Sequence, residues 1–363
     1  AESWKRKSKK MKRKIMFLVA SLGIGGAQKI AAFVMNACVS KYSISVYSLS
    51  NEEINVDLDS KIKVYYASET NPNKLFEKAK EIIEAKKIIQ TVKPDLVIIF
   101  GSYSFPAIGA VLSGTKILGC ERGDPYTYTK VRKIINRALY RKYDYSVFQS
   151  EGAWKFYSVD KERSCVICNP CFPIEMPEIE RENVICAAGR LSEDKGFDTI
   201  LDAFKKLESE FPEYKLVIYG DGPYKEELQR KISNLELNDR VVLYGKVKHL
   251  PDYLQKAKLF VLASWYEGLP NVLIEAMSVG TPIVATDCSP GGARFLMNGG
   301  KRGGIIVPVR EPSIMADAIR AMLTDTKFAS SLGEKGKEIL DLYSPDVIAR
   351  QWDEVIKGVL QEQ

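Results

Sequence analysis

The chain has only one histidine, His249, among its 363 residues. Histidine is the usual general base near neutral pH and a frequent ligand of zinc. Its scarcity argues against a histidine-based catalytic triad, haem ligation and a histidine-rich metal site. His249 stands beside Leu250 and Pro251 in a short connection, which favours a surface position.

Long apolar runs are missing as well, since none reaches the roughly 18 residues that a membrane-spanning helix needs. The beginning of the chain resembles a signal peptide, because basic residues precede the apolar run Ile15–Ala20. That run is short, and a glycine-rich turn ends it where a signal peptide would continue. We therefore expect a basic tail over residues 1–14, a first strand after it, and a cytoplasmic location.

The seven cysteines fit a reducing compartment. Cys165, Cys168 and Cys171 have the spacing of an iron–sulfur motif, but no fourth ligand is evident. Their surroundings, Ser164–Pro170, fit a buried strand that runs into a proline-marked loop better. We expect neither a metal nor another cofactor.

Positive charge is concentrated in the first half of the chain. Residues 1–172 carry 29 Lys and Arg against 16 Asp and Glu, whereas residues 173–363 carry 24 against 30. This asymmetry indicates two domains with different partners, and the basic half suits an anionic membrane surface or a phosphorylated substrate. Specific nucleic-acid readout is disfavoured, because Lys5–Lys14 has little aromatic interleaving.

Both halves alternate short β-rich runs with longer amphipathic segments, which predicts α/β domains with parallel sheets covered on both faces. The expected strands are Lys14–Ala20, Ile44–Leu49, Leu96–Phe100, Lys116–Cys120, Tyr145–Gln149, Cys165–Cys168, Val184–Ala188, Tyr214–Tyr219, Val241–Tyr244, Leu259–Leu262 and Ile283–Thr286. The expected helices are Gly26–Val39, Asn73–Val92, Thr129–Tyr143, Phe197–Glu210, Tyr224–Asn234, Asn271–Val279 and Pro312–Leu323.

The proline-rich stretch Asn169–Asn183 has no clean period and indicates an interdomain linker. The domain boundaries that we expect are 15–170 for the first doubly wound, Rossmann-like domain, 171–183 for the linker, 184–343 for the second such domain and 344–363 for a last helix. Two domains of this kind place a cleft between the carboxyl ends of their sheets.

A glycine loop, Ser21–Lys29, follows the first expected strand. Its Gly25 and Gly26 allow the backbone a close approach to a ligand at a helix N-terminus, so we assign them to the cleft. A nicotinamide site needs G-x-G-x-x-G/A, and Gln28 stands at the third position, so that match is weak. For Gly23 a tight strand-to-helix turn is an equal alternative.

In the second half, four expected strands each end in a loop rich in glycine or charge. Arg190 and Lys195 flank the first of these turns, where two cations are placed to hold a diphosphate; two solvated charges are the alternative. Gly220 and Gly222 follow the next strand and allow the backbone to approach a flat ligand. Four such loops at one sheet edge predict a nucleotide site.

The segment SWYEGLPNVLIEAM, Ser264–Met277, places two glutamates on either side of a turn. Pro270 suits a helix start, so Glu267 lies in the loop and Glu275 in the second helical turn. The N–H groups at the helix start then face a bound anion, and a glutamate beside it can accept hydrogen bonds from ribose hydroxyls. The alternatives are a capping carboxylate for Glu267 and a surface acid for Glu275.

Together these segments resemble the retaining glycosyltransferases of family 4, which have the GT-B fold of two Rossmann-like domains facing a cleft. The similarity is strong from Val184 to about Arg310, and it is weaker but continuous through the first half. The segments that carry it are AAGRLSEDKGFDTILDAF, VIYGDGP, VVLYGKV, SWYEGLPNVLIEAMSVGTPIVATD and GGIIVPV, and E-x7-E is the most specific motif.

The resemblance implies a role for each residue of the cleft. Glu267 would lie by the donor sugar, Glu275 would bind the ribose, and the C-terminal helix would cross back to the N-terminal domain. The residues that it implies for catalysis are Glu267, Arg190 and Lys195. The residues that it implies for donor binding are Glu275, Gly25, Gly26, Gly220, Gly222, Gly268, Leu269, Asn271 and Val272.

The sequence departs from the family at one position, because many members carry a histidine near the sugar in the N-terminal domain. The corresponding loop here is CERGDPYTY, Cys120–Tyr128. A subgroup that acts on surface-polysaccharide or lipid-linked sugars has a similar loop. We therefore expect Glu121, Arg122 and Asp124 on the acceptor side, with a structural salt bridge that caps the loop as the alternative.

The resemblance implies transfer of a sugar from a nucleotide-diphosphate donor, with UDP favoured, to a glycan or polyprenyl-diphosphate-linked acceptor. It implies retention through front-face attack, in which a donor phosphate oxygen takes the acceptor's proton and no metal is required. A sugar-nucleotide epimerase of the GT-B fold is one alternative. A non-catalytic protein that binds nucleotide or nucleic acid is the other.

The segment Thr129–Tyr143 predicts a basic amphipathic helix with apolar residues beneath its charged side. Its cations are Lys130, Arg132, Lys133, Arg137, Arg141 and Lys142. We expect it to lie against anionic lipid together with the tail 1–14, as a peripheral contact on the inner face of the cell membrane. A solvated helix face is the alternative.

Overall fold

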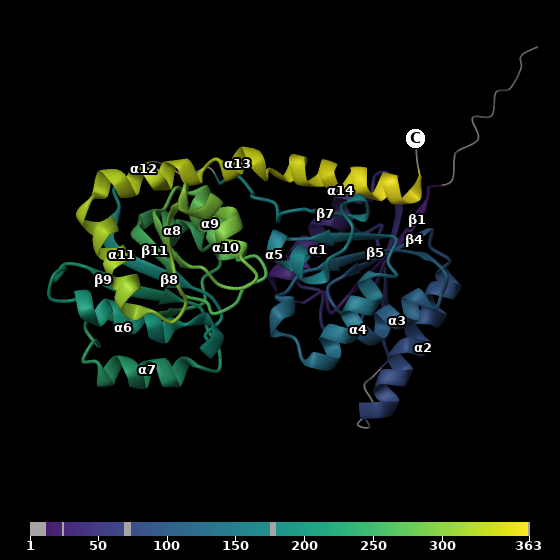
Figure 1. Ribbon diagram of the computed structural model, residues 1–363, viewed down its shortest axis with the longest axis horizontal. Helices are drawn as coiled ribbons and strands as arrows, with labels where there is room; N and C mark the ends of the chain where they lie inside the picture. Colours follow the sequence, from purple (N-terminus) through teal and green to yellow (C-terminus); the bar gives the residue numbers. More distant parts are fainter. Residues whose placement is uncertain (1–11, 24, 69–73, 175–178, 362–363) are drawn as a thin grey trace, which may run out of the picture.

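The computed structural model describes residues 12–23, 25–68, 74–174 and 179–361. The chain forms two α/β domains that lie side by side, with a helical C-terminal segment running along both (Figure 1). Most of the expected basic tail lies outside the described residues. Residues 12–14 of this tail are described, and Lys14 is the first residue of strand β1.

The N-terminal domain is built on seven parallel strands in the order β3-β2-β1-β4-β5-β6-β7. These strands are β1 (Lys14–Val19), β2 (Ser43–Ser48), β3 (Lys63–Tyr66), β4 (Leu96–Phe100), β5 (Lys116–Glu121), β6 (Tyr145–Phe148) and β7 (Ser164–Val166). The helices are α1 (Gly26–Cys38), α2 (Lys74–Val92), α3 (Ser104–Val111), α4 (Lys130–Tyr140) and α5 (Glu151–Tyr157), with 3-10 turns η1 (Pro125–Thr127) and η2 (Lys161–Arg163). Successive strand residues face opposite sides, so Ile15 and Phe17 pack toward α1, whereas Met16 and Leu18 pack toward α2 and α3.

The C-terminal domain has six parallel strands in the order β10-β9-β8-β11-β12-β13. These strands are β8 (Glu182–Ala188), β9 (Lys215–Tyr219), β10 (Val241–Gly245), β11 (Ala257–Leu262), β12 (Ile283–Thr286) and β13 (Gly304–Val307). The helices are α6 (Phe197–Leu207), α7 (Lys225–Asn234), α8 (Pro251–Lys256), α9 (Asn271–Ser278), α10 (Gly292–Leu296), α11 (Pro312–Thr324), α12 (Thr326–Gly336), α13 (Ile339–Leu342) and α14 (Pro345–Leu360), with 3-10 turns η3 (Glu193–Lys195) and η4 (Asn298–Gly300). Ile185 and Ala187 pack with α6 and α11, whereas Cys186 and Ala188 face α9 and α10.

The expected α/β class and the two doubly wound domains are confirmed, but several elements have no expected counterpart, among them β3, α3, α5, β13 and α12. Helix α3 shows why. It contains Pro106 and Gly109, both poor helix formers. Gly109 is packed so tightly on α2 that a Cβ there would lie 2.2 Å from the Ile82 carbonyl oxygen. This helix depends on packing against a neighbour, which local propensity does not report.

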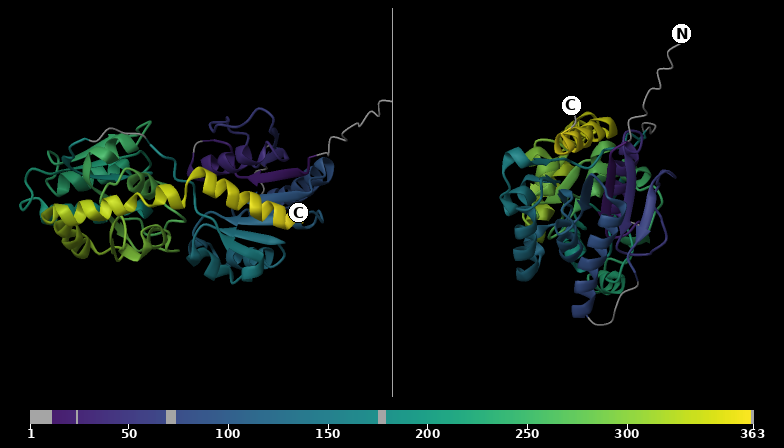
Figure 2. Two further views of the ribbon diagram at one scale, coloured as in Figure 1. Left: turned by 90° about the horizontal axis from the view of Figure 1, so that it is seen from above. Right: turned by 90° about the vertical axis from the view of Figure 1, so that its right-hand side faces the viewer.

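The C-terminal helix α14 returns to the N-terminal domain, as expected (Figure 2). Trp352 is fully buried there, with its ring centroid 5.9 Å from that of Phe100 in β4. Lys41 forms an ion pair with Asp353 at 2.7 Å, and Lys116 donates to the Val359 carbonyl at 2.8 Å. The last helix is therefore part of the first domain's core, although it follows the second domain in sequence.

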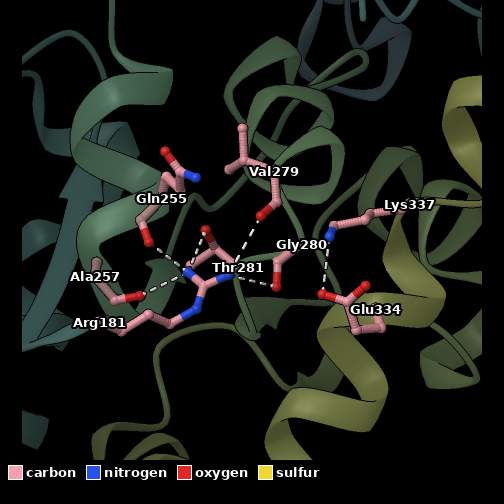
Figure 3. A network of polar contacts seen from close by, with 8 residues as sticks. All are labelled: Arg181, Gln255, Ala257, Val279, Gly280, Thr281, Glu334 and Lys337. Atoms are coloured by element: carbon pink, nitrogen blue, oxygen red, sulfur yellow. Dashed lines mark hydrogen bonds and ion pairs between the residues drawn. The ribbon is translucent and has the colours of Figure 1, made fainter. Parts of the chain in front are cut away.

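The end of the linker is fixed by Arg181, directly before β8 (Figure 3). Its guanidinium donates to the Thr281 hydroxyl and to the carbonyls of Gln255, Ala257, Val279 and Gly280. These carbonyls close α8 and α9, and the last carbonyls of a helix have no partner within it. Arg181 thus holds the carboxyl end of α9, the helix that carries Glu275. Residues 175–178 of the expected linker lie outside the described residues.

Candidate active site

The strand order of the C-terminal sheet reverses between β8 and β11. Open parallel sheets bind ligands beyond the carboxyl ends of their strands at such a switch point. The loop after β8 carries Arg190 and Lys195, and the loop after β11 carries Glu267. The fold therefore brings the three predicted catalytic residues to one part of the sheet edge, where the Arg190 side chain is exposed.

The Lys195 ammonium and the Glu267 carboxylate form an ion pair at this edge. Lys195 Nζ donates to Glu267 Oε1 at 2.6 Å, and the Ser264 hydroxyl donates to the same oxygen at 3.0 Å. The Trp265 amide donates to the Asp194 carbonyl at 2.8 Å, which ties the two loops together. The side chains of Lys195 and Glu267 stay 22% and 17% exposed, so a ligand can reach both. The sequence analysis did not identify Ser264, which only the folded loop brings to the carboxylate.

Helix α9 begins at Asn271, directly after Pro270, as expected. Glu275 lies one turn further along and is partly buried. Burial raises the pKa of Glu275 above its ordinary value, and the charges of Lys29 and His249 oppose that rise. The carboxylate is thus partly withdrawn from water and faces two cationic or potentially cationic groups.

Glu275 lines an interdomain cavity of about 520 Å³. Its walls come from α1 through Lys29, from the linker through Phe172, from the loop after β10 through His249, and from α9 through Asn271. His249 is exposed, as expected, and its Nδ1 lies 2.7 Å from Asp252 Oδ1. Its part in the cavity was missed, although its loop follows a strand at the same sheet edge as the predicted ones.

Gly220 and Gly222 are explained by contacts within the protein. A Cβ on Gly220, whose φ is +136°, would lie 1.8 Å from the Gly189 carbonyl oxygen. A Cβ on Gly222 would lie 2.3 Å from the Leu191 carbonyl oxygen. The close approach that these glycines permit is therefore to the neighbouring loop after β8. Their expected contact with a donor stays a prediction.

The glycine loop of the N-terminal domain meets α9 across the cleft. A Cβ on Gly26 would lie 2.5 Å from Asn271 Nδ2. The side-chain oxygen of Asn271, Oδ1, accepts a hydrogen bond from Asn169 Nδ2 at 2.6 Å. Asn169 Oδ1 in turn accepts one from Arg122 Nη2 at 2.8 Å. A chain of three polar side chains thus links the first domain and the linker to the start of α9. Gly25 precedes α1 as its N-cap residue.

Gly268 is confined where the two domains meet. A Cβ there would lie 2.0 Å from Gln149 Nε2 and 2.8 Å from the Arg122 carbonyl oxygen. The next residue, Leu269, is buried at 7% exposure, whereas Val272 in the first turn of α9 is partly exposed. The backbone from Gly268 to Val272 thus passes between the sheet edge and the N-terminal domain.

The Glu121 carboxylate is completely buried in the N-terminal domain. It accepts from the hydroxyls of Ser102, Tyr128 and Tyr157 and from the backbone amides of Arg122 and Gly123. With no exposed surface and five donors, this carboxylate shapes the loop. Its donors are hydroxyls and backbone amides, which differ from the salt bridge of the alternative, and the expected acceptor contact of Glu121 stays a prediction.

The other two residues of this loop differ in their surroundings. Arg122 stacks on the Phe100 ring at 4.5 Å, and burial lowers the pKa of its guanidinium. Asp124 is 5% exposed and its Oδ1 accepts from the Tyr126 amide at 2.9 Å. Burial raises the pKa of Asp124, and this amide and the Ser289 side chain oppose the rise. Asp124 therefore lies at the boundary with the second domain, and its acceptor contact stays a prediction.

Helix α4 presents apolar as well as basic side chains to solvent. Val131 is 67% and Ile134 is 71% exposed, whereas Leu139 and Tyr140 are buried. The expectation that the isoleucine lies beneath the charged side is therefore wrong for Ile134. The buried residues of this helix, Asn136, Leu139 and Tyr140, lie in its C-terminal half, whereas Val131 and Ile134 in its first half point to solvent.

The three clustered cysteines are free thiols, and Cys168 and Cys171 are buried. Within the described ranges, no group of three or more His, Cys, Asp or Glu side chains is arranged to hold a metal ion. Within the same ranges, no helix has both the length and the hydropathy needed to cross a membrane.

Comparison with known proteins agrees with this architecture. Residues 174–339 match the family model described as glycosyl transferases group 1. The fold is similar to the Anabaena protein HepE in complex with UDP-glucose, with a TM-score of 0.78, 18% identity, and coverage of 95% of this chain and 99% of that one. It is also similar to sucrose-phosphate synthase from Thermosynechococcus elongatus, with a TM-score of 0.80, 20% identity, and coverage of 97% and 100%.

Two relatives from Campylobacter jejuni match along nearly their whole length. One is GalNAc-alpha-(1->4)-GalNAc-alpha-(1->3)-diNAcBac-PP-undecaprenol alpha-1,4-N-acetyl-D-galactosaminyltransferase. It is 25% identical over an alignment of 358 residues, with 95% of this chain and 99% of the relative covered. The other is N-acetylgalactosamine-N,N'-diacetylbacillosaminyl-diphospho-undecaprenol 4-alpha-N-acetylgalactosaminyltransferase, 26% identical over 365 residues, with 93% and 98% covered. The similarity to glycosyltransferases is confirmed: the chain has the GT-B fold, its residues 174–339 match the group 1 glycosyl transferases, and both of these relatives are named as glycosyltransferases.

Proposed function

We propose that this protein is a retaining glycosyltransferase that moves a sugar from a UDP-sugar to a glycan or polyprenyl-diphosphate-linked acceptor. The observation that carries the proposal is an interdomain cavity lined by Glu275 and by Asn271 at the start of α9, together with the Lys195–Glu267 pair in the loops after β8 and β11 at the same sheet edge. The UDP-glucose in the HepE structure supports the choice of donor. The undecaprenol-linked substrates named for the Campylobacter relatives support the choice of acceptor.

The nucleoside part of the donor fits the cavity that Glu275 lines. Its volume of about 520 Å³ lies within the range of small-ligand sites. The ionised Glu275 carboxylate accepts hydrogen bonds from the two vicinal ribose hydroxyls, which a neutral acid does less well. Lys29 from the first domain and His249 from the second lie close enough to favour that ionised form.

The diphosphate lies between the cations and the start of α9. When the bond from the sugar to the diphosphate breaks, negative charge grows on the leaving phosphate oxygen. Lys195, Arg190 and the first N–H groups of α9 stabilise that charge because they are already in place before the reaction. Lys195 lies 2.6 Å from Glu267 and 3.9 Å from Asp194, and a bound diphosphate adds a further anion to the same ammonium.

Retention follows from attack on the face that the diphosphate leaves. The acceptor hydroxyl forms the new bond to the anomeric carbon as the old bond breaks, and its proton passes to a donor phosphate oxygen. The Glu267 carboxylate lies beside the sugar and stabilises its positive charge. The groups named in this mechanism belong to the chain, the donor and the acceptor, so we propose that it requires no metal.

The acceptor is proposed to approach from the N-terminal domain. Asp124 lies at the domain boundary, and α4 follows the loop that carries it. Val131 and Ile134 are exposed between cations, which suits contact with an anionic bilayer surface on the cytoplasmic side. A lipid-linked acceptor would then be presented to the cleft by the membrane on which the enzyme rests.

The proposal is tested by binding and by transfer. We expect UDP and a UDP-sugar to bind with measurable heat in calorimetry, and transfer to a lipid-linked sugar to be lost in Glu275→Ala. The matched control is Glu226→Ala, an exposed glutamate on α7. Near wild-type turnover in Glu275→Ala would contradict the site, and a wild-type protein that binds no nucleotide would contradict the donor.

A further inference from the structure

Gln149 carries a side-chain amide that is buried at the boundary between the two domains. It directly follows β6, and its side chain is 2% exposed. Among the residues that the structure describes, Nε2 has no hydrogen-bond acceptor. A buried donor without an acceptor is unfavourable, because the N–H group loses its water and gains nothing in return. An apolar side chain of the same size would avoid that cost.

The amide nitrogen lies against the segment that carries Glu267. A Cβ added to Gly268 would lie 2.0 Å from Gln149 Nε2, so the two groups are in contact across the domain boundary. Glu267, the preceding residue, is held by Lys195 and Ser264 in the loop after β11. Gln149 therefore places an N–H donor from the first domain against Gly268, the residue that follows the glutamate assigned to the donor sugar.

The position separates Gln149 from the nucleoside. The cavity around Glu275 is lined from the N-terminal domain by Lys29 and Ile30 of α1, and Gln149 is not among its lining residues. Glu267 and Gly268 are absent from that lining as well. A nucleotide-sugar whose nucleoside fills the cavity would therefore meet these residues with another of its parts, and we assign them the sugar.

We propose that Gln149 is a specificity-determining residue that donates a hydrogen bond from Nε2 to an oxygen of the transferred sugar. This role rests on the proposed function and extends it. In this proposal the second domain binds the nucleotide, whereas the first domain recognises the sugar. The recognising group is the Gln149 N–H, which forms its hydrogen bond only when the sugar is bound. Because a mismatch leaves a buried N–H group unpaired, such a donor discriminates strongly between sugars.

The experiment compares the affinity for UDP with the affinity for UDP-sugars. Calorimetry would measure the Kd of each ligand for the wild-type protein and for Gln149→Leu. The ligands are UDP, UDP-glucose, UDP-N-acetylglucosamine, UDP-galactose and UDP-N-acetylgalactosamine. For the UDP-sugar that the wild type binds best, we expect the Kd to rise about tenfold in Gln149→Leu, the cost of one lost hydrogen bond. The Kd of UDP should change less than twofold, because UDP lacks the sugar.

Two further variants make the result independent of folding. Gln149→Met removes the donor with an unbranched side chain, and it should repeat the effect if the leucine is badly accommodated. Gln229→Leu, at an exposed glutamine of α7, is the matched control and should change neither Kd. The melting temperature of the protein without nucleotide should not fall in Gln149→Met, because the lost N–H group has no acceptor in the part of the chain that the structure describes.

The outcomes separate this role from the function on which it rests. Equal Kd ratios of UDP-sugar to UDP in the wild type and both variants would overturn the role of Gln149 while leaving the donor site intact. A lower melting temperature in Gln149→Met without a change in that ratio would identify a structural residue and overturn it as well. A wild-type protein that binds neither UDP nor any UDP-sugar would overturn both proposals.

Discussion

The two domains have the same parallel α/β topology but use their buried carboxylates differently. In the N-terminal domain, Glu121 is completely buried and accepts five hydrogen bonds from its own domain. In the C-terminal domain, Glu267 has one ammonium and one hydroxyl partner and stays 17% exposed, and Glu275 lines a cavity. A carboxylate with every partner inside the protein serves the fold, whereas one with unused acceptor capacity at a cavity is available to a ligand.

The largest expected effect is on catalysis in the C-terminal domain. Lys195→Ala removes the ammonium that faces the leaving phosphate, and we expect kcat/KM to fall by roughly 10²–10³-fold, as for loss of one preorganised charge donor. The measurement is steady-state transfer from the preferred UDP-sugar. Lys225→Ala, at an exposed lysine of α7, is the control. A fall in kcat/KM of less than fivefold would contradict the position of the leaving phosphate beside Lys195.

Glu121→Leu tests the other side of the comparison. It leaves three hydroxyls and two backbone amides without their shared acceptor, so we expect the free energy of unfolding to fall by about 3 kcal/mol. Urea denaturation followed by circular dichroism measures this loss, with Glu162→Leu, an exposed site in the same domain, for comparison. Unchanged stability together with abolished acceptor use would instead make Glu121 a ligand-binding residue.

Arg181 provides a structural counterpart within the C-terminal domain. Arg181→Met removes donors to four carbonyls at the ends of α8 and α9, and we expect a loss of about 2 kcal/mol in unfolding free energy. The affinity for UDP should also weaken, because α9 carries Glu275. Arg320→Met removes a more exposed guanidinium from α11 and should cost much less. Equal losses in the two variants would deny Arg181 a special role.

The charge difference between the domains predicts which one meets a membrane. Ile134→Ser in α4 should weaken binding to vesicles containing anionic lipid by about tenfold, because one large side chain no longer leaves water. The matched control in the second domain is Ile314→Ser, at a site that is 44% exposed. Flotation measures both variants. If the wild-type protein binds none of the vesicles, the proposed membrane contact is contradicted.

The smallest expected effect concerns pH. Burial raises the pKa of Glu275 above 4.5, so its ionised form is lost at a higher pH than for a free glutamate. As the pH is lowered, UDP affinity should therefore begin to fall at a higher pH than a free glutamate would predict, since the protonated acid accepts ribose hydroxyls poorly. A raised pKa also means that the folded state binds the proton more readily, so this group adds stability as the pH falls. Glu275→Gln should remove the step in UDP affinity, and a step that persists would assign it to another group.

Much of the fold was predictable because strand and helix periods are local properties of the sequence. The alternation of the two periods predicted parallel sheets, and the glycines and cations after Val184–Ala188 and Leu259–Leu262 predicted a site at the sheet edge. The short edge strand β3 and the glycine-containing helix α3 were not predicted. Both depend on packing against neighbours, and a neighbour distant in sequence leaves no local signal.

The sequence by itself determined the domain class, the turn at Pro270 and the separate positions of Glu267 and Glu275, because proline and glycine act on the chain nearest to them. Only the tertiary structure decided which polar groups have partners. It surrounded Glu121 with five donors, brought Lys29 and His249 to Glu275, turned Ile134 to solvent and left the Gln149 amide unpaired beside Gly268. Whether a polar side chain is satisfied depends on atoms from other strands and from the other domain, which meet only when the chain is folded.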